Sequence, residues 1–562
     1  MRWSRIWMVL CLCGAILCAG AARADDPAPP HRPKLVVVLV VDQMRNDYIE
    51  MYGAQWTQGF RRLLKNGARF RNAAYPYFNT VTCAGHATIG TGTFPSTHGM
   101  VLNAWWDRQA KKQVSCTDDP HISLLSYGPP VNHGNSPNKL LAPTLAGELR
   151  AQRGPASRIV SLSLKARSAL MLAGQQADAV TWFETETGSW VTSMVYTQTP
   201  VPFLEKFFRM HPVERDFKRV WDRRLSARSY QFEDNGKGDK PPEYWSPLFP
   251  HPLRDRQRSP RPDADFYSAW CASPYSDAYL ARMAAAAVEE LGLGKGSSTD
   301  FLAVSFSALD LVGHSFGPRS HEVQDLLGRL DITIGALLAE LDRMVGTGNY
   351  VLALSADHGV AAIPEQLQRE GADAGRVVTN EIAQRVEHAL TERWGSGKYV
   401  TRLLYTDLYF APGIYQRLLA DPPAMDAVLT AIRSVRGILQ VFRSEELGDR
   451  SADGDPMRRS VALSYHPDRS GDLILIPREN WFFVNASPVN PPGPATTHGT
   501  GYPYDARVPV ILMGMGIRRG EYSGSASPAD IAPTLASLAG ISLPKAEGRV
   551  LAEALSAPPA KP

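Results

Sequence analysis

The chain has 562 residues, of which 44% are hydrophobic and 21% charged, so it can form a large buried core with inserted segments. Its formal net charge is +4, and Arg2, Arg5 and Arg23 supply three of these charges. The remaining balance is near neutral and gives no argument for an anionic membrane surface as partner. For the same reason we predict no nucleic-acid partner.

The N-terminus has the pattern of a secretory signal peptide. A basic start precedes a short apolar stretch (residues 7–20), and an A-x-A cleavage signal (residues 22–24) follows. We predict a signal peptide over residues 1–24 with cleavage near Ala24, a linker over residues 25–34, and a periplasmic or secreted mature protein. The apolar stretch is too short for an ordinary membrane span, and an uncleaved anchor is the alternative. We predict no membrane span in the mature protein.

Five apolar runs alternate with helical patterns along the chain. The first run, KLVVVLVVDQM, is continuous and rich in β-branched residues, as expected for a strand buried on both faces of a parallel sheet. The alternation predicts an α/β fold with a mostly parallel central sheet flanked by helices. The predicted strands lie in residues 34–44, 158–167, 300–310, 349–359 and 507–514, and clear helical patterns lie in residues 276–292 and 321–344.

Two long segments interrupt this alternation. Residues 205–270 are rich in proline, arginine and aromatic residues and have the composition of an inserted cap. Residues 363–490 contain helical and short strand patterns of their own. We therefore predict one catalytic domain over residues 35–555, with insertions at about 205–270 and 363–490.

Aspartates and histidines gather where the predicted strands end. Ligands of open parallel sheets bind at the carboxyl ends of the strands. Carboxylate oxygen and imidazole nitrogen are normal zinc ligands, and six of them suit two ions, which can clamp both oxygens of an in-line phosphoryl transfer. The alternative is that each aspartate caps a helix and each histidine is an ordinary core or surface residue. The six residues are Asp42, Asp310, His314, Asp357, His358 and His498.

The stretch TVTCAGHATIGTG (residues 80–92) offers nucleophiles for such a reaction. CAGHATIG has the small residues of a closely packed helix start, and a hydroxyl at its N-cap lies where the helix dipole favours an anion. Thr82 would take this place, activated by a bound metal. Cys83 is the rival, because a thiolate is a better nucleophile but is at risk of oxidation outside the cell. Cys83 could instead pair with Cys116, although three cysteines beyond the signal leave one unpaired and sequence does not fix the pairing.

Taken together, these motifs resemble the alkaline phosphatase superfamily, which also contains nucleotide pyrophosphatase/phosphodiesterases and sulfatases. The likeness is to the secreted, phosphate-irrepressible alkaline phosphatases with a threonine nucleophile (PafA type), and the order of the motifs matches from about residue 35 to residue 550. The motifs are Asp42, TVTCAGH around Thr82, DxxxH at Asp310 and His314, ADHG at Asp357 and His358, and HGT at His498.

The resemblance implies two Zn²⁺ ions per subunit and a phosphothreonine intermediate on Thr82 rather than chemistry at Cys83. It also argues against a sulfatase, because neither C-x-P-x-R nor S-x-P-x-R begins at the nucleophile position. By this likeness, one ion would be held by Asp42, Thr82, Asp357 and His358. The other ion would be held by Asp310, His314 and His498.

Three further residues bear on the substrate. By the same resemblance, Asn103 in LNAWWD would donate its amide to a phosphoryl oxygen, and Lys165 and Arg167 look like the Lys/Arg pair of PafA-type monoesterases. Lys165 and Arg167 have the same parity on the strand predicted at 158–167, so both would face one side. A monoester dianion carries a negative oxygen that a diester lacks, and a lysine with an arginine fork would offset it. The alternative is that both are solvated loop charges.

The sequence therefore predicts a periplasmic alkaline phosphatase that hydrolyses small phosphorylated substrates, namely phosphate monoesters, to an alcohol and inorganic phosphate. A phosphodiesterase or nucleotide pyrophosphatase on the same metal core is the first alternative. A catalytically inactive protein that binds phosphorylated ligands is the second. The sequence does not indicate an oligomeric state.

Overall fold

The structure is a computed structural model that describes residues 32–254, 259–450, 454–485 and 493–556. The predicted signal peptide (residues 1–24) and most of the predicted linker lie outside the described residues. Within the described ranges, no helix combines the length and the apolar character that crossing a bilayer requires.

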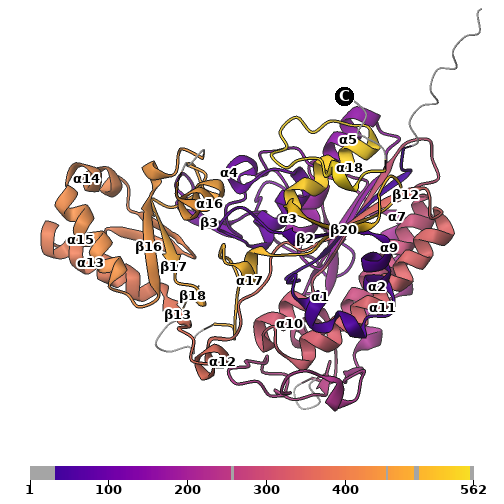
Figure 1. The fold of residues 1–562 in the computed structure, drawn as a ribbon, viewed down its shortest axis with the longest axis horizontal. Helices are drawn as coiled ribbons and strands as arrows, with labels where there is room; N and C mark the ends of the chain where they lie inside the picture. Colours follow the sequence, from indigo (N-terminus) through magenta and orange to yellow (C-terminus); the bar gives the residue numbers. More distant parts are fainter. Residues whose placement is uncertain (1–31, 255–258, 451–453, 486–492, 557–562) are drawn as a thin grey trace, which may run out of the picture.

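A ten-stranded mixed sheet forms the centre of the main body (Figure 1). Its five middle strands run parallel, whereas the strand next to them on either side pairs antiparallel. The predicted α/β fold is therefore confirmed, and the strand predicted at 507–514 forms but runs against its neighbours. The strand order is β20 (Gly520–Ala526), β2 (Ala68–Ala73), β19 (Val510–Gly514), β12 (Tyr350–Ser355), β1 (Leu35–Val41), β11 (Asp300–Phe306), β6 (Ile159–Ser163), β7 (Ala179–Glu184), β8 (Ser189–Ser193) and β5 (Leu124–Ser126).

Strand β1 is buried on both faces, as its apolar run predicts. Its odd-numbered residues pack into one core and its even-numbered residues into another, because successive side chains of a strand point to opposite faces. Helices cover both faces of the sheet, and the helices predicted at 276–292 and 321–344 form. On the odd face lie α2 (Gly59–Asn66), α9 (Pro274–Leu291) and α11 (His321–Met344). On the even face lie α3 (Thr82–Thr91), α5 (Leu145–Arg153), α6 (Ala166–Ala173) and α18 (Ile531–Ala539).

Residues between α7 (Pro202–Met210) and α8 (Ala264–Cys271) pack behind α10 (Ala308–Phe316). His251 and Trp245 lie with their ring centroids 5.4 Å and 6.4 Å from the Phe316 ring at the end of α10. This aromatic packing supports the helix that carries Asp310 and His314.

A separate lobe, orange in Figure 1, follows β12 along the chain. It has its own apolar core between a four-stranded antiparallel sheet and its helices. The turn between its first two strands, Tyr405 and Thr406, packs against the main body. The exact extents predicted for the insertions, 205–270 and 363–490, stay predictions. The sheet order is β14 (Val400–Leu404), β15 (Asp407–Phe410), β17 (Leu473–Pro477) and β16 (Ile438–Arg443), and the helices are α13 (Thr379–Trp394), α14 (Ile414–Ala420) and α15 (Pro422–Arg433).

Two predicted strands end earlier than their apolar patterns suggest. Strand β6 ends at Ser163, Lys165 is the N-cap of α6, and Arg167 lies in the first turn of that helix. The argument that Lys165 and Arg167 face one side through strand parity is therefore wrong. Similarly, β11 ends at Phe306, and Asp310 lies in the first turn of α10.

We expect the packing behind α10 to depend on Trp221, which is fully buried and donates its indole N–H to Asp325 over 2.8 Å. Trp221→Ala should lower the free energy of unfolding by about 3–5 kcal/mol through the cavity it leaves. Trp221→Phe keeps an aromatic ring there and should cost about 1 kcal/mol for the lost hydrogen bond. Urea unfolding followed by circular dichroism measures both, and equal losses would contradict this account.

Candidate active site

Three buried aspartates meet at the carboxyl edge of three adjacent strands. Asp42 follows β1 directly, Asp357 follows β12, and Asp310 lies on α10 just after β11. Their exposed fractions are 0%, 0% and 3%. Because β12, β1 and β11 are parallel neighbours, their ends bring together carboxylates that lie 268 and 47 residues apart in the chain.

The six predicted aspartate and histidine ligands form two groups that can each hold a metal ion. Within each group the ligand atoms lie within 4.8 Å of one another. The rings of His358 and His498 stack with centroids 3.4 Å apart, so the two groups adjoin. Asp310 and His314 share a helix face, as their spacing predicts, with Oδ1 and Nε2 3.2 Å apart. One group is Asp42, Asp357 and His358, and the other is Asp310, His314 and His498.

All three imidazoles have the same orientation. The Nδ1 atoms of His314, His358 and His498 lie 2.9, 2.9 and 3.0 Å from the backbone carbonyl oxygens of Thr496, Gly359 and Thr80. A carbonyl only accepts, so each Nδ1 carries a proton and each Nε2 faces the aspartates. Metal-binding histidines in proteins are oriented in this way.

The electrostatics of the cluster favour a bound cation. Burial raises the pKa of Asp42 well above its usual range, and the carboxylates of Asp310 and Asp357 raise it further. Burial alone would lower the pKa of Lys165, but Asp310 and Asp42 raise it, because Nζ lies 2.5 Å and 2.6 Å from their oxygens. Burial lowers the pKa of His358. One ammonium beside three carboxylates leaves excess negative charge.

The donor atoms fit divalent metal ions. Oδ1 of Asp42 and Oδ2 of Asp357 are buried and, among the described residues, face imidazole nitrogens at 3.2–3.5 Å without a well-formed hydrogen bond. Buried carboxylate oxygens are normally paired, so these two are available as ligands. Carboxylate oxygens with neutral imidazoles are a zinc-type ligand set. The protein therefore has residues suited to metal binding.

Thr82 is the first residue of α3 and Val81 is its N-cap, so the prediction that Thr82 is the N-cap is wrong by one residue. Its Oγ1 lies 3.3 Å from Nε2 of His358, and the residue is 1% exposed. Gly85 lets the helix approach this edge, since a Cβ there would lie 2.1 Å from the backbone oxygen of Asp357. The structure thus places the predicted nucleophile at the metal-binding group.

The rival nucleophile is excluded by a disulfide between Cys83 and Cys116, which the sequence left open. Cys271 is free and buried. The backbone N–H of Cys83 donates to Oδ1 of Asn103 over 2.8 Å, which brings Asn103 to the start of α3. Lys165 reaches the aspartates, whereas Arg167 is half-buried beside Tyr405.

Gln43 and Asp505 support the cluster and were missed by the sequence analysis. Gln43 is fully buried, has φ of 69°, and donates its side-chain amide to Oδ1 of Asp310 over 2.7 Å and its backbone N–H to Asp357. Asp505 accepts hydrogen bonds from the backbone of Gly499, next to His498, and from Thr500. Gln43 directly follows Asp42 at the end of a strand, and this position could have indicated a role at the site. No feature of the sequence around Asp505 indicates its role.

Two other residues near the cluster come from different parts of the chain. His86 lies between Asp357 and Ser305, with Nδ1 3.2 Å from Oδ2 of Asp357 and Nε2 2.8 Å from the serine hydroxyl. Tyr405 of the lobe has φ of 53°, and its ring closely approaches Gly499. The ring therefore packs beside the loop that carries His498.

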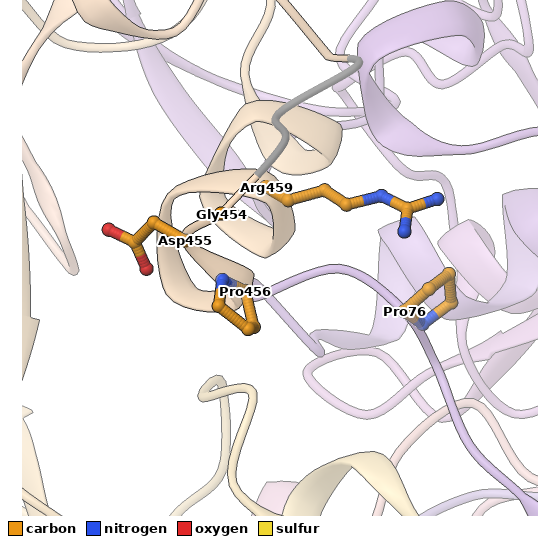
Figure 2. Close-up of a pocket in the computed structure, with 5 residues that line it drawn as sticks. All are labelled: Pro76, Gly454, Asp455, Pro456 and Arg459. Carbon is orange, nitrogen blue, oxygen red and sulfur yellow. The ribbon is translucent and has the colours of Figure 1, made fainter.

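A separate hollow of about 380 Å³ lies between the loop at Pro76 and the start of α16 (Pro456–Ser464). Figure 2 shows Arg459 extending from α16 toward Pro76 along this hollow. None of the predicted site residues lines it. The metal-binding groups, rather than this hollow, form the candidate active site.

Comparisons with known proteins agree with this geometry. The sequence profile of the family "Type I phosphodiesterase / nucleotide pyrophosphatase" matches residues 36–500. Alkaline phosphatase PafA of Elizabethkingia meningoseptica is 31% identical over 97% of this chain and 98% of its own length. Alkaline phosphatase PhoV of Synechococcus elongatus is 29% identical over 97% of this chain and 99% of its own length.

The fold has a solved counterpart. The crystal structure of wild-type PafA matches with a TM-score of 0.84 and 30% identity, and the match covers 94% of this chain and all of that one. A second crystal structure is of a PafA mutant with substitutions at a threonine, an asparagine, a lysine and an arginine.

We expect Gln43 to tune metal affinity, because it holds Asp310 in place. Gln43→Ala and Gln43→Gly should each weaken metal binding by about 10–100-fold. The glycine variant should be about 1–2 kcal/mol more stable than the alanine variant, because glycine relaxes the positive φ. Competition with a chromogenic chelator measures the affinity, and unfolding measures the stability. Unchanged metal affinity in both variants would contradict a role for Gln43.

Proposed function

The chain belongs to the type I phosphodiesterase / nucleotide pyrophosphatase family of phosphoesterases, and we propose that it is an alkaline phosphatase of the PafA type. It would hydrolyse phosphate monoesters to an alcohol and inorganic phosphate. The observation that carries the proposal is the pair of aspartate–histidine groups, with every Nε2 turned inward, at the hydroxyl of Thr82.

The spacing of the substrate-binding residues supports the same assignment. The residues substituted in the PafA mutant structure are a threonine, an asparagine, a lysine and an arginine separated by 21, 62 and 2 positions. Thr82, Asn103, Lys165 and Arg167 have the same residue types and the same separations (103 − 82 = 21, 165 − 103 = 62, 167 − 165 = 2). We therefore assign Thr82 as nucleophile and the other three as phosphoryl-binding residues.

Two zinc ions are the proposed cofactors, held as the resemblance implies, with Thr82 sharing the ion of Asp42, Asp357 and His358. Bound zinc would acidify an oxygen acid and offset charge on the phosphoryl group. The Thr82 hydroxyl would lose its proton and attack phosphorus to form a phosphothreonine, while the P–O bond to the leaving group breaks and its oxygen takes up a proton to give the alcohol. Buried at the start of α3, Thr82 lies where the helix dipole stabilises the anionic oxygen. Hydrolysis of the phosphothreonine then releases inorganic phosphate.

Asn103, Lys165 and Arg167 would select the monoester. The Lys165 ammonium and Arg167 guanidinium offset the second negative oxygen of a monoester dianion, and Asn103 donates its amide to a phosphoryl oxygen. Small phosphorylated molecules are the proposed substrates. A periplasmic or secreted location is also proposed, and the Cys83–Cys116 disulfide supports an oxidising compartment.

A phosphodiesterase on the same core is the second candidate. It is favoured by one observation, that Lys165 Nζ pairs with Asp42 and Asp310 rather than standing clear of them. If Lys165 stayed there during turnover, it would not reach the substrate and the preference for a dianion would be lost.

The first test compares para-nitrophenyl phosphate with bis-para-nitrophenyl phosphate on the zinc-loaded protein. We expect kcat/KM to favour the monoester and Thr82→Ala to lower it by about 10³-fold or more, because the nucleophile is gone. Thr91→Ala is the matched control, since this hydroxyl, in the last residue of α3, donates to the Ala87 carbonyl and bonds to Thr93 just beyond the helix. A preference for the diester would identify a phosphodiesterase.

The second test examines the roles of the Lys165 and Arg167 side chains. Lys165→Ala and Arg167→Ala should each lower monoester kcat/KM by about 10²–10³-fold, as loss of a donor to a developing charge does. Diester kcat/KM should change much less, because the diester lacks the second negative oxygen. Equal losses on both substrates would mean that these residues maintain the metal groups instead of binding the dianion.

A further inference from the structure

Asn103 is held from two sides by the two cysteines of the disulfide. The backbone N–H of Cys83 donates to its side-chain Oδ1 over 2.8 Å. The backbone N–H of Cys116 donates to its backbone oxygen over 3.0 Å. The disulfide joins these two donors across a sequence separation of 33 residues, with their Cα atoms 6.7 Å apart.

This arrangement fixes which way the Asn103 amide points. A backbone N–H can only donate, so the atom that faces Cys83 must be the carbonyl oxygen of the side chain. The amino group, Nδ2, is then on the other side of the Cβ–Cγ bond from the oxygen that faces Cys83. In the part of the chain that the structure describes, Nδ2 has no hydrogen-bond acceptor of its own, so it can donate to a ligand.

The same link joins two elements that also share one apolar cluster. Cys83 is the second residue of α3, next to Thr82, whereas Asn103 and Cys116 flank the hairpin of β3 (Ala104–Asp107) and β4 (Lys112–Ser115). Both cysteines are fully buried in one apolar cluster. The covalent bond therefore ties the base of the hairpin to the residue after the nucleophile.

We propose that the Cys83–Cys116 disulfide is a positioning element for catalysis, which sets the amide of Asn103 against the phosphoryl group on Thr82. The inference rests on the proposed function, because it takes Asn103 as a phosphoryl donor. Misplacing such a donor by about 1 Å can cost up to about 10²-fold in rate, so the bond has a catalytic consequence beyond its effect on stability. It also explains why a cysteine adjoins the nucleophile in an enzyme that uses a hydroxyl.

The test is a double-mutant cycle between the disulfide and the amide. Zinc-loaded wild type, Cys83→Ala/Cys116→Ala, Asn103→Ala and the triple variant are assayed with para-nitrophenyl phosphate and with inorganic phosphate as inhibitor. Removing the disulfide should lower kcat/KM about tenfold and weaken phosphate inhibition in wild type. In the Asn103→Ala background it should change both less than twofold, since the donor it positions is absent.

The controls separate positioning from general damage. Cys271→Ala removes the buried free thiol and should leave kcat/KM and phosphate inhibition unchanged. Metal content should be equal in all variants, and the thermal midpoint should fall by the same amount on disulfide removal with or without Asn103. If the double variant does not fold, wild type and Asn103→Ala are instead reduced with a phosphine and compared at equal thiol content.

Three outcomes would overturn the inference. These are equal fold losses with and without Asn103, a loss that follows metal content, and no loss at all on removing the disulfide. Failure of the proposed function gives a different result, namely that the wild type with its disulfide intact does not hydrolyse the monoester.

Discussion

The burial of three carboxylates at one sheet edge is the constraint on which the site depends. Asp42, Asp310 and Asp357 repel one another in a medium that screens charge poorly, and Lys165 offsets only part of that charge. The histidines add no positive charge of their own where burial keeps them neutral, as it does for His358. Bound cations would reduce the repulsion among these carboxylates, so the cluster is suited to binding them.

The scaffold holds this cluster from several directions. The parallel strands β12, β1 and β11 fix two aspartates directly, and α10 adds the third with packing behind it from His251 and Trp245. Asp505 fastens the loop after His498 to the chain, and its own backbone oxygen accepts from Gly359, next to His358. Both metal-binding groups therefore share one brace, which fastens the loop that carries His358 and the loop that carries His498.

The sequence predicted what local patterns and strand ends determine. The apolar run before Asp42 predicted β1, and the spacing of Asp310 and His314 predicted a shared helix face. The end of β6 was missed because polar and apolar residues continue to alternate past Ser163 as far as Arg167, so the pattern shows no boundary before Lys165. Gln43 could not be assigned a role, because its partner Asp310 lies 267 residues away and only the tertiary fold brings it near.

The proposed metal ligands alone would not determine which phosphate ester is cleaved, because one fold can carry more than one activity. The residues proposed to select the substrate are not among these ligands, and they occupy elements of their own. Asn103 lies before a hairpin tied to α3 by the disulfide, and Lys165 and Arg167 lie at the start of α6. Substrate choice can therefore change through the placement of these short segments while the carboxylates, histidines and Thr82 stay where the sheet holds them.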